Sequence, residues 1–141
     1  MTDDEYKDFM EGMEAFIKKL CEDPETAKLF EEMERKQHYW VLNGHTPVPC
    51  KSPLMWSYWF ERATEDGSRI VARDQVGNHV CSTVFLGLNH RHFGEGPPIL
   101  FETMVFTPGK DSEPAGRCCT WEEAEAMHAE HLGQLRRRQN N

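Results

Sequence analysis

Long apolar runs are missing from this chain of 141 residues. No stretch approaches the roughly 18 consecutive apolar residues that mark a membrane-spanning helix, so we expect a protein that does not cross a bilayer. The motifs of common nucleotide-binding proteins and hydrolases are also missing: there is no GxxxxGK(S/T), GxGxxG or GxSxG and no protein-kinase signature. The sequence gives no support for these chemistries, and we expect a non-enzymatic protein that uses no cofactor.

A pattern of paired cysteines is absent too. The cysteine count is five, there is no CxxC spacing, and the N-terminal segment lacks the apolar stretch of a secretory signal. These features argue against a disulfide scaffold, a zinc ribbon and a thioredoxin-type redox pair, and they predict a cytoplasmic protein with reduced thiols. The cysteines are scattered as Cys21, Cys50, Cys81, Cys118 and Cys119.

Positive charge is scarce, particularly near the N-terminus. The net charge is −8, and residues 1–36 account for −6 of it, with 12 acidic against 6 basic residues. Phosphate backbones repel an acidic protein, so we expect no direct binding of nucleic acid. A basic surface on another protein is the better candidate partner.

Residues 1–36 are predicted to form an acidic helical hairpin that precedes a core domain of residues 37–141. Asp23 followed by Pro24 marks the start of the second helix, as N-cap and first-turn residue. The hairpin is expected either to pack on the core or to act as an acidic appendage that binds a basic partner or mediates self-association. Its apolar positions are Phe9, Met13, Phe16, Ile17 and Leu20 in the first helix and Ala27, Phe30 and Met33 in the second.

The core domain is predicted to be of the α+β class. One helix starts after Ser52 as its N-cap, and another starts at the capping box of Thr120 and Glu123. Between them, "SRIVARDQV", "NHVCSTVFLGL" and "ILFETMVF" predict a small antiparallel sheet of about three to four strands packed by helices. Both faces of the second strand are apolar, so we expect helices to cover it on both sides. The predicted inner stripe of the last helix is Ala124, Met127, His131, Leu132 and Leu135.

The segment "NHRHFGEGPP", residues 89–98, joins two of these strands and is longer than a tight hairpin requires. Loops mounted on rigid sheets are where binding residues concentrate, and arginine and aromatic side chains are frequent anchors of interfaces. The plain alternative is a hairpin turn stiffened by its two prolines. We predict a partner-binding loop formed by His90, Arg91, His92, Phe93 and Glu95.

The carboxylate of Glu102 is an anomaly in an otherwise apolar strand. An unpaired charge would be costly there, so we expect either an exposed strand end or an ion pair, with a catalytic carboxylate as the alternative. Together with Asn89, Glu102 forms a secondary candidate site. The candidate partners for the ion pair are Arg69, Arg73 and Arg91.

Histidines and thiols invite a metal interpretation, since zinc takes four nitrogen or sulfur ligands. The spacings give it little support. His128 and His131 do not have the HExxH spacing, and the neighbouring Cys118 and Cys119 would point to opposite faces of a strand. We therefore predict no metal site and interpret the histidines, including the pair His90 and His92, as packing or surface residues.

Five motifs follow one another with short spacings: "YWVLNGHTPVP", "WSYWFERA", "STVFLGLNH", "GPPILFETMVF" and "TWEEAEAMH". With them, residues 38–131 resemble a family of small uncharacterised proteins encoded in tailed-phage and prophage genomes. Residues 1–36 lie outside the resemblance. Asn89 stands where the family pattern has the Asp of "GLDH", so a property that depends on an acidic residue there is expected to differ in this chain.

The resemblance implies an accessory protein that acts in the host-cell cytoplasm. An acidic accessory protein can modify host machinery or blunt host defence by occupying a basic, nucleic-acid-binding surface. The leading hypothesis is a non-enzymatic binder of a host or defence protein, such as an inhibitor of a nuclease-type defence system. Two alternatives stay open. One is a small-molecule-sequestering protein or metal-dependent enzyme that uses His90, His92 and Glu102, and the other is a virion assembly component that self-associates through its N-terminal helices.

Overall fold

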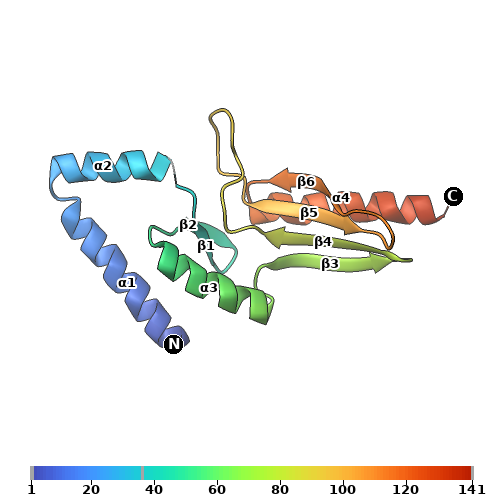
Figure 1. Ribbon diagram of the computed structural model, residues 1–141, viewed down its shortest axis with the longest axis horizontal. Coiled ribbons are helices and arrows are strands. Elements are labelled where there is room, and N and C mark those ends of the chain that lie inside the picture. The colour runs from blue at the N-terminus through green and yellow to red at the C-terminus, as the bar shows by residue number, and fades with distance from the viewer. Residues whose placement is uncertain (1, 36, 141) are drawn as a thin grey trace. The chain divides into compact units, whose positions relative to one another are not determined.

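The computed structural model describes residues 2–35 and 37–140, and the chain divides into two compact units, Met1–Gln37 and His38–Asn141. The predicted α+β class is confirmed (Figure 1). A helical segment precedes a two-stranded antiparallel sheet and a four-stranded antiparallel sheet, each accompanied by a helix. None of the helices found in the described residues is long and apolar enough to span a membrane.

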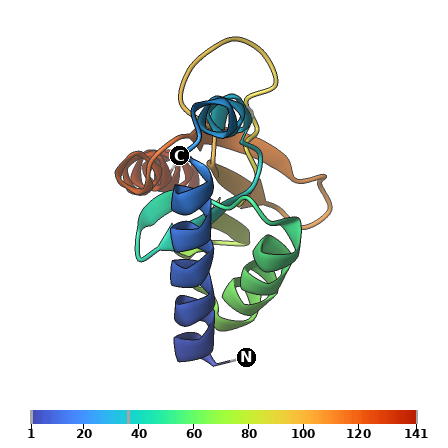
Figure 2. The same cartoon turned by 90° about the vertical axis from the view of Figure 1, so that its left-hand side faces the viewer.

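The first unit contains α1 (Asp3–Leu20) and α2 (Pro24–Arg35). A reciprocal capping box starts α1: the backbone N–H of Thr2 donates to Glu5 Oε2 at 2.8 Å, and that of Glu5 donates to Thr2 Oγ1 at 3.2 Å. The cap predicted at Asp23 is confirmed, because its Oδ2 accepts from the backbone N–H of Thr26 at 3.2 Å. The two helices diverge from their short connection and do not run side by side along their length (Figures 1 and 2).

The apolar stripe predicted on α1 is not buried where its side chains are described. Phe9, Phe16 and Leu20 are all exposed. The side chains of Met13, Ile17, Phe30 and Met33 lie outside the described residues. The first unit therefore combines a strong negative charge with exposed apolar side chains.

The second unit opens with a small hairpin of β1 (Trp40–Asn43) and β2 (Thr46–Pro49), whose turn contains Gly44 at φ 62°. The prolines of β2 are tolerated because it pairs on one side only. The segment around β1 is also bonded to the chain that follows β4: the backbone N–H of Trp40 donates to the carbonyl of Gly87 at 2.8 Å. The small hairpin thus holds the chain that leads into residues 89–98.

Helix α3 (Pro53–Asp66) starts at the predicted N-cap Ser52, whose hydroxyl accepts from the backbone N–H of Met55 at 3.3 Å. It is anchored by Trp56, whose indole Nε1–H donates to the carbonyls of Trp40 at 3.1 Å and Gly87 at 2.9 Å. Gly87 has φ 77°, and a Cβ there would lie 3.2 Å from the Trp56 and Phe60 rings. Only glycine combines this backbone conformation with so close an approach of two aromatic rings.

The larger sheet has the order β3 (Ile70–Val76), β4 (His79–Phe85), β5 (Phe101–Phe106), β6 (Glu113–Cys118), and all its neighbours are antiparallel. Strand β6 is not evident in the sequence because "EPAGRC" contains proline and glycine and has no apolar alternation. Helix α4 (Trp121–Gln139) runs behind this sheet in Figure 1 and contacts all four strands, whereas α3 packs against β1 beyond the end of the sheet.

The inner stripe predicted for α4 was wrong at two positions. His131 and Met127 are only half-buried on the flank of the helix, whereas His128 is 4% exposed and faces the sheet. The reason is that Trp121, buried at the first position, sets the helical register, and the residues three or four apart from it face inward. The buried residues of α4 are Trp121, Ala124, His128, Leu132 and Leu135.

The expectation of helices on both faces of β4 is also not met within the second unit. Cys81, Thr83 and Phe85 face α4 and are buried. On the other face, Val80 and Val84 are half-buried and Ser82 between them is buried, whereas Phe106 beside Val80 is exposed. Within the described residues of this unit, α4 covers one face of the sheet, as antiparallel sheets permit.

Candidate functional site

Residues 89–98, called the contact loop below, leave the sheet between β4 and β5 and project away from it (Figure 1). Three hydrogen bonds close the neck of the loop. The backbone N–H of His90 donates to the carbonyl of Ile99 at 2.9 Å. The side-chain Oδ1 of Asn89 accepts from the backbone N–H of Arg91 at 2.9 Å and from that of Ile99 at 3.1 Å. Asn89, predicted as part of a secondary site, therefore holds the two ends of the loop together.

Arg91 braces the interior of the loop. Its Nε–H donates to the carbonyl of Pro97 at 2.8 Å. Gly96 has φ 152°, and a Cβ at that position would lie 2.9 Å from the guanidinium carbon of Arg91. The guanidinium group thus lies against the backbone on the far side of the loop, which restrains the loop without any regular secondary structure.

The outer part of the contact loop consists of exposed residues. His92, Phe93 and Glu95 are all exposed, and Phe93 has 89% of its surface accessible to solvent. The five residues predicted to bind a partner therefore fall into two groups. Arg91 and His90 are half-buried and engage the loop backbone, whereas His92, Phe93 and Glu95 face outward.

His90 takes part in the local bonding of the loop. Its Nδ1 lies 2.9 Å from the carbonyl oxygen of Leu88, a contact in which the ring N–H donates. The rings of His90 and His92 have centroids 6.0 Å apart. Nowhere in the described part of the chain does a group of three or more His, Cys, Asp or Glu residues have an arrangement that could hold a metal ion.

Glu102 does form an ion pair, but not with a predicted partner. The Nε of Arg117 lies 2.8 Å from Glu102 Oε2, and the two residues are directly opposite in β5 and β6. The side chain of Glu102 is 13% exposed. The expected ion pair is confirmed, but the predicted partners were wrong because strand β6, which carries Arg117, was not recognised. Glu102 thus has a structural partner and lies on the sheet rather than in the contact loop.

No protein-family model, curated protein or solved structure matches this chain. The resemblance to phage-encoded proteins consequently stays a prediction.

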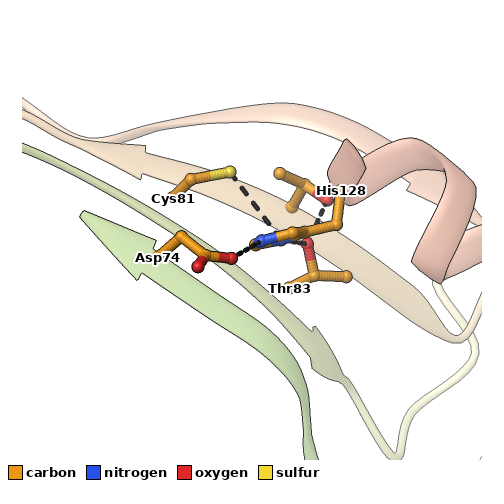
Figure 3. A network of polar contacts seen from close by, with 5 residues as sticks. Asp74, Cys81, Thr83 and His128 are labelled. Carbon is orange, nitrogen blue, oxygen red and sulfur yellow. Dashed lines mark hydrogen bonds and ion pairs between the residues drawn. The ribbon is translucent and has the colours of Figure 1, made fainter. Parts of the chain in front are cut away.

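A second constellation, which the sequence did not reveal, lies between α4 and the sheet (Figure 3). His128 of α4 is its centre: Nε2 lies 2.7 Å from Asp74 Oδ2 on β3, and Nδ1 lies 2.8 Å from Thr83 Oγ1 on β4. Thr83 Oγ1 in turn lies 2.6 Å from Thr103 Oγ1 on β5. The sulfur of Cys81 lies 3.8 Å from His128 Nδ1.

The grouping of Cys81, His128 and Asp74 has the residue types of a nucleophile, a base and an orienting carboxylate. The burial of Cys81 argues against nucleophilic catalysis by this group. Cys81 is 0% exposed, so no substrate reaches its sulfur. Burial, and to a lesser degree the negative charge of Asp74, raises the pKa of the Cys81 thiol, whereas a nucleophile requires a lowered one. The network instead satisfies buried polar groups and ties α4 to three strands.

The sequence contained part of the signal for this network. Alternation along β4 places Cys81 and Thr83 on one face, because successive side chains of a strand point to opposite sides. His128 was not predicted to lie on the buried face of α4. That position follows once Trp121 is taken as the first residue of the buried stripe. Because His128 is engaged in this network, it does not pair with His131 in the way that a zinc site would need.

Proposed function

We propose that this chain is a non-enzymatic binding protein whose contact loop inserts Phe93 into an apolar pocket on a partner protein. The observation that supports the proposal is the 89% exposure of Phe93 at the outside of a loop whose neck and interior are hydrogen-bonded. A lone exposed apolar residue is common on protein surfaces. An aromatic ring held outward on a braced loop is instead the arrangement of an interface anchor.

The hydrogen bonds within the contact loop should increase its affinity for a partner. Ordering a flexible loop on binding costs conformational entropy, and a loop that is already restrained loses less. Asn89 and Arg91 supply the restraint through backbone contacts, and this leaves His92, Phe93 and Glu95 to meet the partner. The proposal therefore assigns different tasks to the residues predicted as one binding group.

The partner that we propose is a host or defence protein with a basic surface, in the cytoplasm of a phage-infected or prophage-carrying cell. The net charge of −8, of which residues 1–36 contribute −6, would attract such a surface and speed the encounter at low salt. The phage context comes from the resemblance described above. Inhibition of a nuclease-type defence protein is one consequence of covering a basic, nucleic-acid-binding surface.

The test compares Phe93→Ala with Leu54→Ala, which removes another strongly exposed apolar side chain, from α3. Tagged wild-type protein and both variants are used to capture proteins from a bacterial lysate at low and at high salt. Any stoichiometric partner is then purified and titrated by calorimetry. Loss of a central aromatic anchor raises the Kd by at least about 30-fold, whereas loss of a surface leucine outside the interface changes it little.

Equal affinity of Phe93→Ala and wild type would overturn the loop as the binding element. An interaction that does not weaken with salt would overturn the basic partner surface. If the protein captures only itself, sedimentation of the purified chain would measure self-association and favour the assembly alternative.

A further inference from the structure

A hollow of about 330 Å³ lies where the second half of α4 passes over the end of β5, the start of β6 and the turn between them. It is at the opposite end of β5 from the contact loop. Small-molecule sites span roughly 300–1,000 Å³, so this volume limits a ligand to a small one. The hollow is lined by Val105, Thr107, Lys110, Asp111, Pro114, Ala115, His131, Gln134, Leu135 and Arg138.

The floor of the hollow is apolar and its rim is polar. Val105 and Leu135 belong to the core cluster beneath α4, and Leu135 is buried. On the rim, His131, Gln134 and Arg138 follow one flank of α4 at positions i, i+3 and i+7. An apolar floor with a few convergent polar groups is the usual composition of a ligand site.

The position of His131 depends on Gly116 of β6. A Cβ at Gly116 would lie 3.1 Å from His131 Nε2 and 2.9 Å from Met127 Sδ. The absence of a side chain at Gly116 therefore allows His131 to lie close to the backbone of β6, at the edge of the hollow.

The charges of the rim are unusual for an acidic protein. Lys110 comes from the β5–β6 turn and Arg138 from α4, and both line the same hollow. Neither side chain makes a hydrogen bond or an ion pair with any residue that the structure describes, and the same holds for Asp111 and His131. The described rim thus carries two cations, Lys110 and Arg138, and one carboxylate, Asp111.

We propose that this hollow binds a small monocarboxylate with a short aliphatic body. Lys110 and Arg138 can both pair with a single carboxylate, whereas Asp111 would repel a phosphate dianion more strongly. Arg138 and Lys110 hold the carboxylate, and Gln134 and Thr107 are further hydrogen-bonding groups at the rim. The aliphatic body lies on Val105 and Leu135.

The proposal is tested on the purified full chain by NMR titration with acetate, butyrate and hexanoate, and with inorganic phosphate as the competing anion. The backbone amide signals of residues 107–111 and 131–138 should shift. Affinity should rise by roughly fourfold for each methylene group that the floor covers. Equal affinity for all carboxylates and for phosphate would identify a non-specific anion effect and overturn the proposal.

Arg138→Gln and Arg137→Gln provide a matched pair. Both remove one positive charge from the last turn of α4, but only Arg138 lines the hollow. We expect Arg138→Gln and Lys110→Gln to weaken butyrate binding by about tenfold and Arg137→Gln to leave it unchanged within about twofold. Equal losses for the two arginine variants would overturn the site. Phe93→Ala should bind butyrate like wild type, so this result is independent of the proposed contact-loop function.

Discussion

The Nε2 atom of His128 lies 2.7 Å from the Oδ2 atom of Asp74, so the long helix α4 is tied to the outer strand β3 through an imidazole that is almost fully buried. Asp74 itself is 45% exposed on its side chain, which lets water share the solvation of its carboxylate. The imidazole has no such access. Its second nitrogen, Nδ1, has Thr83 Oγ1 as its hydrogen-bond partner. Removing the imidazole should therefore destabilise the helix–sheet contact more than removing the carboxylate of Asp74.

Replacing His128 by Ala should lower the free energy of unfolding by about 2–4 kcal/mol, because it leaves a cavity and removes a partner from buried Thr83. Asp74→Asn should cost less, about 1 kcal/mol, because Asp74 is half-exposed and an amide still reaches the ring. His131→Ala, at a half-buried position on the same helix, is the control and should change stability little. Urea unfolding followed by tryptophan fluorescence measures all three. Equal losses for His128→Ala and His131→Ala would contradict the structural role of the network.

Asn89 is expected to act through its side-chain oxygen, which accepts two backbone hydrogen bonds at the neck of the contact loop. Asn89→Ala should speed hydrogen exchange at the amides of Arg91 and Ile99 by about tenfold, equivalent to roughly 1.4 kcal/mol of lost local stability. Asn89→Asp should leave exchange within about twofold of wild type, because a carboxylate oxygen accepts the same bonds. An aspartate at this position would then be compatible with the neck of the loop. Faster exchange in the Asp variant would show that the amide group itself is required.

Cys118 should be the slowest of the partly exposed thiols to react with an alkylating reagent. Burial, followed by the charges of Glu123 and Cys119, raises its pKa to about 11 from 9.0. At pH 8 this lowers its thiolate fraction roughly a hundredfold relative to an unperturbed thiol. Timed iodoacetamide labelling with mass spectrometry measures the rates, and a urea-unfolded sample supplies the reference. A Cys118 rate in the folded protein equal to its unfolded rate would contradict the shift.

The same shift has a consequence for stability. The folded state holds the Cys118 proton more tightly than the unfolded state. The stability that the Cys118 thiol contributes to the folded state is therefore fully present below pH 9 and is lost as the pH rises toward 11. Between pH 9 and pH 11 the unfolding free energy of the wild type should therefore fall relative to that of Cys118→Ser, because serine does not ionise in this range. A difference that is constant between pH 8 and pH 11 would argue against the shift.

Some features of this protein follow from local chemistry and were predictable residue by residue. Asp23, Ser52 and Thr120 begin helices because their side-chain oxygens accept amides within the first turn, and that requires no distant contact. The alternation along β4 likewise follows from strand geometry. The exposed loop after β4 was predictable because prolines and glycines follow a strongly apolar strand.

Other features depend on which elements become neighbours, and a single sequence does not state that. Arg117 is 15 residues from Glu102 and lies in a strand that has no apolar pattern, so their pairing appears only when β6 is placed beside β5. The division of the loop residues into bracing and outward groups also required the positions of the Pro97 and Ile99 backbones.

Composition and the spacings of a few residues were enough to predict the α+β class, the helix starts, the acidic N-terminal segment and the location of the contact loop. The folded structure was needed to find that His128 rather than His131 faces the sheet, that Cys81 is buried from solvent, and that Lys110 and Arg138 line one hollow. These outcomes depend on contacts between residues far apart in the chain. Their free energy arises from burial and pairing across elements, which no local pattern records.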